Sequence, residues 1–400
     1  TTGIESQRGI PGHQQNPFIA MVSKGCTQES GYVYAMNLIY SSNFEAGVTK
    51  DQFDNDRMFI GINHEGFEWK LEPGELLEIP EAVMVFSASG LGHMTRTFHD
   101  LYRNHLIRSG WKYMPRPILI NNWEATHFDF DSDKLIEIAE RAADKGIEMF
   151  VMDDGWFGKR NNDMAGLGDW YVNKEKFPNG IDELIDNVNK LGMDFGIWVE
   201  PEMVNPDSDL YRTHPDWAYH FEHRNADELR HQLVLNMTRG DVQNYIFECL
   251  DNLLENHNIK YIKWDMNRPF SQVGAENLEN AKMYSYLHTM AVYKIVDELK
   301  KRHPQVQFES CASGGGRCDL GAISHYDQVW TSDNTDAIDR MTIQKGYSLL
   351  HPVKTMRAWV TDICGINKPC SLDFRFNIAM QGSLGIGGNL IKYSAEDLEI

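Results

Sequence analysis

Short apolar segments alternate with longer amphipathic segments after about residue 110, and this alternation restricts the fold more than any other feature of the sequence. The pattern is typical of βα units arranged around a parallel sheet. Eight segments are predicted to be strands, at residues 117–123, 148–154, 194–200, 232–237, 261–266, 306–311, 328–332 and 383–390. Eight such strands close one barrel, and residues 111–400 have the usual length of that fold. We therefore predict an α/β fold, a (β/α)8 TIM barrel, over residues 111–400.

The first part of the chain has a different pattern. Residues 31–39, 58–62, 67–71 and 81–87 are rich in β-branched and aromatic residues and are separated by Gly, Asn and Asp. This predicts antiparallel strands. A helix is predicted over 94–107, ending at Ser109-Gly110. We place the domain boundary near residue 110, so that residues 1–110 form an antiparallel β part with a linker helix.

Composition excludes several classes of protein. Lys and Arg number 38 against 58 Asp and Glu, and the net charge of −20 repels nucleic acid and anionic membranes. No apolar run approaches the ~18–20 residues of a membrane helix. The six cysteines and fifteen histidines lack the spacing of metal sites, and the Gly-rich stretches lack that of nucleotide-binding loops. We expect no metal, no cofactor and, from the low cysteine density, a cytoplasmic location.

Carboxylates and tryptophans recur where the predicted strands end. The segments at these ends are 121–124, 153–156, 198–202, 263–268, 309–314 and 330–336. In a parallel barrel the carboxyl ends of the strands form the open mouth, where ligands bind. Carboxylates accept hydrogen bonds from sugar hydroxyls, and indole rings pack against the C–H face of a sugar. The sequence therefore favours a small neutral carbohydrate as the ligand.

Two aspartates are candidates for the chemistry. Alternation along a strand places Lys263, Asp265 and Asn267 on one face, where the lysine keeps the aspartate ionised. The alternative is a structural ion pair at the barrel rim. Asp333 follows a later strand and can act as a general acid opposite Asp265. Its alternative role is to cap the helix near residue 338, a role that we assign instead to Asp336 or to the threonine before it.

Four segments, 153–158 (DDGWFG), 263–268 (KWDMNR), 310–317 (SCASGGGR) and 330–336 (WTSDNTD), resemble in this order the motifs of the α-galactosidases of glycoside hydrolase family 36. The resemblance implies a retaining hydrolase of melibiose and raffinose-type α-galactosides, with Asp265 as nucleophile and Asp333 as acid/base. It implies that Asp153 and Asp154 bind the O4 and O6 hydroxyls of galactose. It also implies that Trp123 and Trp198 form walls of the sugar pocket. The remaining implied contacts are Arg230, Lys263, Asn267, Cys311 and Gly314.

The resemblance also implies that residues 1–110 end an N-terminal β-sandwich domain, that the chain is a fragment of a longer enzyme, and that the whole enzyme is a homotetramer. Glu200 and Glu202, on either side of a proline, are expected to lie behind the residues that touch the sugar. Alternatives keep the same site: an α-N-acetylgalactosaminidase, a galactosyltransferase of the raffinose-synthase type, or an inactive sugar-binding barrel. A phosphosugar isomerase or aldolase would instead need Lys263 to form a Schiff base.

Overall fold

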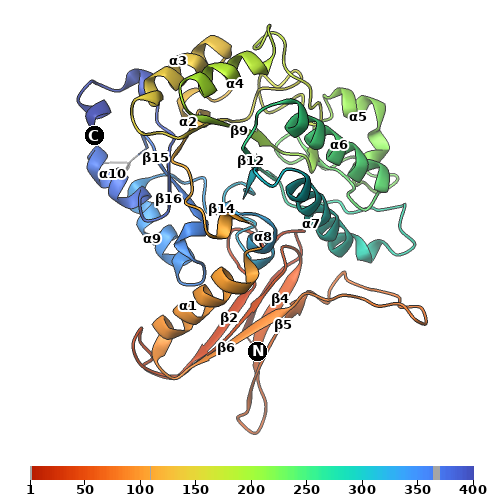
Figure 1. The fold of residues 1–400 in the computed structure, drawn as a ribbon. Coiled ribbons are helices and arrows are strands. Elements are labelled where there is room, and N and C mark those ends of the chain that lie inside the picture. Colours follow the sequence, from red (N-terminus) through yellow and green to blue (C-terminus); the bar gives the residue numbers. More distant parts are fainter. Residues whose placement is uncertain (1, 109, 364–369) are drawn as a thin grey trace.

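A closed barrel of eight parallel strands forms the larger part of the molecule (Figure 1). The computed structural model describes residues 2–108, 110–363 and 370–400. The barrel strands are β7 (Leu119–Asn121), β8 (Met149–Met152), β9 (Asp194–Val199), β12 (Tyr261–Trp264), β13 (Gln307–Ser310), β14 (Gln328–Trp330), β15 (Met356–Val360) and β16 (Ser383–Ile386). Strand β16 pairs with β7 and closes the ring. The predicted TIM barrel is confirmed.

One predicted barrel strand is wrong and one was missed. Residues 232–237 contain β11 (Leu233–Val234), which pairs antiparallel with β10 (Met203–Val204) outside the barrel. A short buried apolar run has the same pattern in either place, so periodicity does not separate them. The missed strand is β15, where Arg357 interrupts the apolar run. This arginine is completely buried and donates to the Leu384 carbonyl at 2.7 Å, a partner that the sequence does not reveal.

The longer helices of the barrel part pack around the strands. They are α3 (Ser132–Ala143), α4 (Ile181–Lys190), α6 (Gly240–Asn256), α7 (Tyr284–Arg302), α9 (Ala337–Ser348) and α10 (Leu372–Ala379), with shorter helices α2 (Trp123–Thr126), α5 (Asp209–Thr213) and α8 (Leu320–His325). Their apolar faces and the outward faces of strands such as β12 and β13 form one large core, in which Ile262 and Phe308 are completely buried. No helix in the described ranges is long and apolar enough to cross a membrane.

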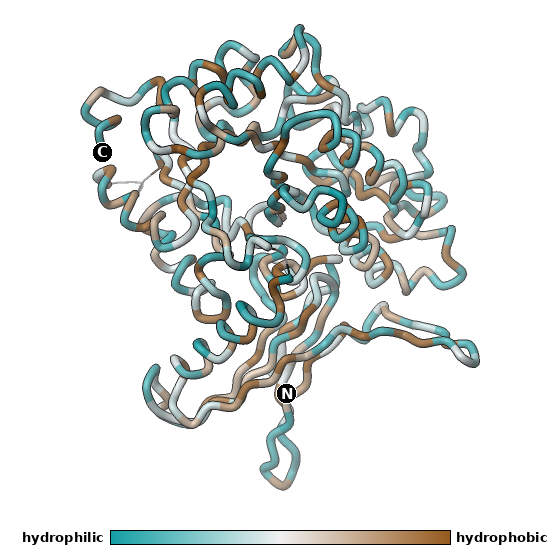
Figure 2. Tube along the Cα trace, viewed as in Figure 1, coloured by the Kyte–Doolittle hydropathy of each residue, from teal (hydrophilic) through white to brown (hydrophobic). Residues whose placement is uncertain are grey.

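The N-terminal part contains two antiparallel sheets of three strands. One has the order β1 (Thr2–Ser6), β4 (Phe44–Lys50) and β5 (Asp56–Ile62), and the other β2 (Phe18–Val22), β3 (Val33–Leu38) and β6 (Ala82–Ser87). Figure 2 shows apolar residues along these strands and hydrophilic residues in the turn at the bottom of the view. Helix α1 (Gly90–Leu101) and a π-helix over Tyr102–Leu106 follow.

The prediction of a strand at residues 67–71 is wrong, and Trp69 in this segment packs edge-on against Tyr286 of α7 at 5.4 Å between ring centroids. Ser109, at the predicted end of the linker helix, lies outside the described residues, and the boundary near residue 110 stays a prediction. The two parts touch through Ser41, whose hydroxyl donates to Asp319 at the start of α8 at 2.6 Å.

Candidate active site

A pocket lies at the carboxyl ends of the barrel strands, where the sequence concentrates its carboxylates and tryptophans. The lining residues are Trp123, Glu124, Phe128, Asp153, Asp154, Asp163, Trp198, Arg230, Lys263, Asp265, Asn267, Trp330, Asp333 and Trp359. Nine of the eleven residues implied by the family resemblance are among them. The pocket thus combines acidic side chains with four indole rings, the composition expected for a carbohydrate site.

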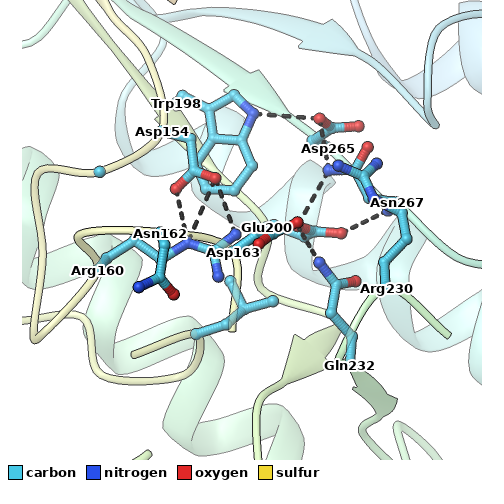
Figure 3. Close-up of polar contacts among 12 residues, drawn as sticks. Asp154, Arg160, Asn162, Asp163, Trp198, Glu200, Arg230, Gln232, Asp265 and Asn267 are labelled. Carbon is cyan, nitrogen blue, oxygen red and sulfur yellow. Dashed lines mark hydrogen bonds and ion pairs between the residues drawn. The ribbon is translucent and has the colours of Figure 1, made fainter. Parts of the chain in front are cut away.

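Asp265, directly after β12, accepts hydrogen bonds at both of its carboxylate oxygens. Its Oδ1 accepts from the backbone N–H groups of Met266 at 2.8 Å and Ser313 at 3.3 Å. Its Oδ2 accepts from the Trp198 indole at 3.1 Å and from Asn267 Nδ2 at 2.8 Å (Figure 3). Asp265 is only 6% exposed, and these donors favour its charged form. Its two oxygens are therefore fixed in orientation toward the pocket.

Lys263 supplies the positive charge that keeps this aspartate ionised. Burial by itself raises the pKa of Asp265, but the Lys263 ammonium, followed by hydrogen bonds from Cys311 and Asn267, holds that pKa below its usual value. Lys263 Nζ also donates to Asp153 Oδ2 at 2.9 Å and lies 5.0 Å from the centroid of the Trp359 ring. Strand alternation is confirmed here, because Lys263, Asp265 and Asn267 all line the pocket.

Asp154 is bound by a buried arginine that sequence reasoning missed. Arg160 Nε donates to Asp154 Oδ1 at 2.9 Å and Nη2 donates to Oδ2 at 2.8 Å, a bidentate pair. Arg160 Nη1 donates to Asn205 at 3.0 Å, and Asn205 in turn donates to the carbonyl groups of Asp163 and His231. One amide therefore connects the two loops that form this side of the pocket. The only sequence signal for Arg160 is its position just after the DDGWFG segment.

Asp333 lies beyond the end of β14, in contact with the solvent of the pocket. The Trp330 indole donates to its Oδ1 at 2.9 Å. The surrounding protein and then the negative charge of Asp265 raise the pKa of Asp333. The helix-capping role belongs to Asp336, which accepts from the backbone of Ile338 at 2.8 Å, as expected. Asp333 is therefore free of the cap and faces the pocket.

A buried arginine holds the loop that carries Asp333. Arg340 donates to the Thr331 hydroxyl at 2.8 Å and to the backbone carbonyls of Ser332 at 2.6 Å and Asn334 at 2.7 Å. Its guanidinium also lies over the Trp330 ring, 4.5 Å from the centroid. The loop around Asp333 is thus fixed on both sides by one α9 side chain.

Two of the eleven predicted site residues do not line the pocket. Cys311 is buried and hydrogen-bonds Asp265 from behind, and burial raises the pKa of its thiol, so it is not a nucleophile. Gly314 has a φ of +82°, and a Cβ there would lie 2.5 Å from the Asp333 backbone nitrogen. Its close approach supports the Asp333 loop. Arg230 reaches the same region, donating to the Ser313 hydroxyl at 3.4 Å.

Several lining residues were not predicted as site residues: Glu124, Phe128, Asp163, Trp330 and Trp359. Glu124 and Trp330 lie in the strand-end segments that the sequence singled out. Trp359 belongs to β15, the strand that was missed, so no pattern pointed to it. Phe128 packs edge-on against Trp123 at 5.2 Å and holds that indole in place.

The two glutamates around Pro201 are completely buried and do not line the pocket, as expected. Glu202 Oε1 accepts from Trp264 at 2.7 Å and from Arg317 at 2.9 Å, and His288 lies 3.0 Å from Oε2. Although burial opposes it, the Arg317 charge lowers the pKa of Glu202 to about 2. This ionised cluster stabilises the barrel wall behind the pocket.

Asp265 and Asp333 are therefore in opposite states in this pocket, where burial also raises the pKa values of Asp154 and Glu124. Asp265 is held ionised and ready to attack an electrophilic carbon, whereas Asp333 is shifted toward the protonated form that can donate a proton. Two carboxyl groups whose surroundings separate their pKa values are typical of sites in which one acts as a nucleophile and the other as a general acid and base.

Comparison with known proteins identifies the family. The melibiase family model matches residues 77–400, and the model of the glycosyl hydrolase family 36 N-terminal domain matches residues 1–72. α-Galactosidase AgaA of Geobacillus stearothermophilus is 46% identical over 406 residues, which cover 100% of this chain and 56% of that protein. The bifunctional α-galactosidase/sucrose kinase AgaSK of Mediterraneibacter gnavus is 42% identical, over 99% of this chain and 42% of that protein.

Solved structures agree. The AgaA crystal structure matches with a TM-score of 0.97, and the α-galactosidase of Lactobacillus brevis with a TM-score of 0.98 at 40% identity, covering 100% of this chain and 54% of that one. The fold and the site define a TIM-barrel glycoside hydrolase. The chain belongs to glycoside hydrolase family 36, the melibiase family. It spans about half the length of the curated relatives it matches.

Proposed function

We propose that the protein carrying this chain is a retaining α-galactosidase that removes terminal galactose from α-galactosides such as melibiose and raffinose-type oligosaccharides. The observation that carries the proposal is the pairing of an ionised Asp265 with an Asp333 of raised pKa in one pocket. The named relatives are α-galactosidases, and variants of AgaA have been crystallised with raffinose and stachyose.

In the first step Asp265 attacks the anomeric carbon while Asp333 protonates the glycosidic oxygen. The bond from carbon to the leaving oxygen breaks as the ester to Asp265 forms. In the second step the ionised Asp333 takes a proton from water, which attacks the same carbon and releases Asp265 as a carboxylate. Two inversions give galactose of retained configuration. This mechanism requires the two carboxyl groups to be about 5–5.5 Å apart in the sugar complex.

The remaining pocket residues bind the galactose. Asp153 and Asp154 are proposed to accept hydrogen bonds from O4 and O6, because both carboxylates line the pocket and are fixed by buried cations. Trp123 and Trp198 present indole rings as walls. The other proposed contacts to hydroxyl groups are Arg230, Lys263 and Asn267.

The test is covalent labelling of the whole protein with an activated fluorogalactoside, followed by peptide mapping. We expect the label on Asp265 in the peptide that contains β12, and ¹H NMR of hydrolysis should show α-galactose as the first product. A β-galactose first product, or a label on a different carboxyl group, would overturn the proposal. Comparing hydrolysis with transfer to sucrose, and galactosides with N-acetylgalactosaminides, identifies the preferred reaction.

Three properties of the whole protein remain proposals. The β part up to about residue 110 is proposed as the end of a separate sandwich domain, and the whole enzyme as a homotetramer, which light scattering of the complete protein tests. A cytoplasmic location is proposed from the low cysteine content. Of the described cysteines, Cys26, Cys249, Cys311 and Cys318 are free, whereas Cys370 is disulfide-bonded. Thiol trapping in intact cells therefore tests the location, since persistent oxidation of Cys370 would contradict it.

A further inference from the structure

Glu200 is a buried carboxyl group next to the pocket with no role in the mechanism above. It follows β9 directly, is completely buried, and does not line the pocket, so it does not reach the sugar. Figure 3 shows it between Gln232 and the Asp265–Asn267 pair. Burying a carboxyl group this completely costs free energy, which its hydrogen bonds must offset.

Among the residues that the structure describes, two neighbours donate hydrogen bonds to Glu200. Its Oε1 accepts from the Asn267 backbone N–H in a short contact. Its Oε2 accepts from Asn267 Nδ2 at 3.0 Å and from Gln232 Nε2 at 3.2 Å. Two of the three donors therefore belong to Asn267, one from its backbone and one from its side chain.

Asn267 in turn has its whole amide group committed. One Nδ2 hydrogen goes to Glu200, and the other goes to Asp265 Oδ2 at 2.8 Å. Its Oδ1 accepts from the Ser313 hydroxyl at 3.1 Å. An amide nitrogen carries only two hydrogens, so the bond to Glu200 fixes the direction of the bond to Asp265. The side chain of Asn267 therefore links Glu200 to Asp265.

We propose that Glu200 is a positioning residue for the nucleophile: by accepting from both N–H groups of Asn267, it aims the asparagine amide at the carboxylate of Asp265. The inference rests on the proposed function, because it takes Asp265 as the nucleophile.

Protonation of Glu200 leaves this geometry intact. Burial and then the negative charge of Asp265 raise the pKa of Glu200 to about 8, against the opposing charge of Arg160. The proton has an acceptor, because Gln232 Oε1 is buried without a hydrogen-bond partner among the described residues, and a turned Gln232 amide presents that oxygen to Glu200. A protonated Glu200 keeps lone pairs on both oxygens and still accepts from Asn267.

The substitution Glu200→Gln isolates this acceptor. Glutamine has the same shape and keeps one oxygen for the Asn267 backbone, but its amide nitrogen has no lone pair for Asn267 Nδ2. We expect kcat/KM to fall about tenfold to a hundredfold, the range for loss of the charge-assisted hydrogen bond from Asn267 to Asp265. The acid limb of kcat/KM should move to higher pH, since the Asn267 bond lowers the pKa of Asp265. A merely structural role for Glu200 would not move that limb.

The controls use the whole protein. Glu255→Gln, on the exposed surface of α6, should change neither kcat/KM nor the pH profile. Asn267→Ala breaks the connection directly, and the double variant should be no slower than Asn267→Ala alone. If Glu200→Gln stays within twofold of the wild type with an unmoved acid limb, or if the two substitutions act additively, the inference is wrong.

A poorly folded Glu200→Gln protein does not end the test. Glu200→Asp keeps two acceptor oxygens on a shorter side chain, and it should recover part of kcat/KM and return the acid limb toward its wild-type position. Failure of that recovery in a folded protein also contradicts the inference. If the wild-type protein is labelled at a residue other than Asp265, the proposed function is wrong. If the label is on Asp265 and Glu200→Gln has unchanged activity, only the proposed role of Glu200 is wrong.

Discussion

The substitution Lys263→Met tests two effects of one ammonium group, which forms an ion pair with Asp153 and lowers the pKa of Asp265. Lys263 Nζ lies 2.9 Å from Asp153 Oδ2, and the two side chains are only 6% and 3% exposed. Removing one partner of a buried ion pair typically costs about 3–5 kcal/mol, because the remaining charge is left without compensation. With a urea m-value near 3 kcal/mol/M, that loss lowers the unfolding midpoint by about 1–2 M.

The second effect concerns Asp265, the proposed nucleophile. Lys263 is the largest influence that lowers the pKa of Asp265, acting against burial. In Lys263→Met that pKa rises, so the ionised fraction of Asp265 at acidic pH falls and the acid limb of kcat/KM moves to higher pH. The assay is kcat/KM for an aryl α-galactoside from pH 4 to pH 9, together with urea unfolding of the same samples.

The double variant Lys263→Met, Asp153→Asn distinguishes the two effects. It removes the stranded carboxylate, so most of the lost unfolding free energy should return, while the acid limb should stay displaced. Lys301→Met is the matched control. Lys301 and its partner Glu298 are both exposed, and such surface ion pairs contribute at most about 1 kcal/mol to the free energy of unfolding. Recovery of both stability and the acid limb in the double variant would refute the assignment of the nucleophile shift to Lys263.

Three further substitutions test other contacts. Trp330→Phe removes the indole bond that lowers the pKa of Asp333, so the pKa rises and the basic limb of kcat/KM should move to higher pH. Arg160→Met strands the buried Asp154 carboxylate, and we expect kcat/KM to fall at least a hundredfold and galactose inhibition to weaken in parallel. Glu202→Gln removes a carboxylate whose pKa is lowered to about 2. Its stabilising effect is present above the usual pKa of 4.5 and is lost toward pH 2, so the difference in unfolding free energy between wild type and variant should shrink over that interval.

The barrel was predictable because strand and helix periods differ so clearly after residue 110. The errors arose where a polar side chain interrupts a strand or an apolar run lies outside the sheet. Arg357 in β15 is buried by hydrogen bonds to distant carbonyls, and such long-range partners leave no trace in local periodicity. For the same reason the short antiparallel strand β11 was indistinguishable from a barrel strand.

The site was predictable to the extent that its residues sit at strand ends. Alternation alone placed Lys263 and Asp265 on one face, and the family motifs added the residues around them. Trp359 was missed with its strand. Arg160 was missed because a bidentate pair with Asp154 inside one loop leaves no periodic pattern in the sequence. Cys311 and Gly314 have motif positions but lie behind the pocket, where they support Asp265 and Asp333.

Cations accompany some of the carboxyl groups of the site, although burial raises the pKa of Asp154 even beside Arg160. Asp153 is paired with Lys263, Asp154 with Arg160, and Glu202 with Arg317. Within the described ranges, neither Asp333 nor Glu200 has an ion pair, and the pKa of each is raised by desolvation, by the protein around the pocket for Asp333 and by complete burial for Glu200, and then by the charge of Asp265. A single ionised aspartate therefore biases both neighbours toward protonation. When Asp265 is esterified in the proposed intermediate its charge disappears, the bias on Asp333 is relieved, and Asp333 becomes better able to exist as the carboxylate that the second step needs as a base.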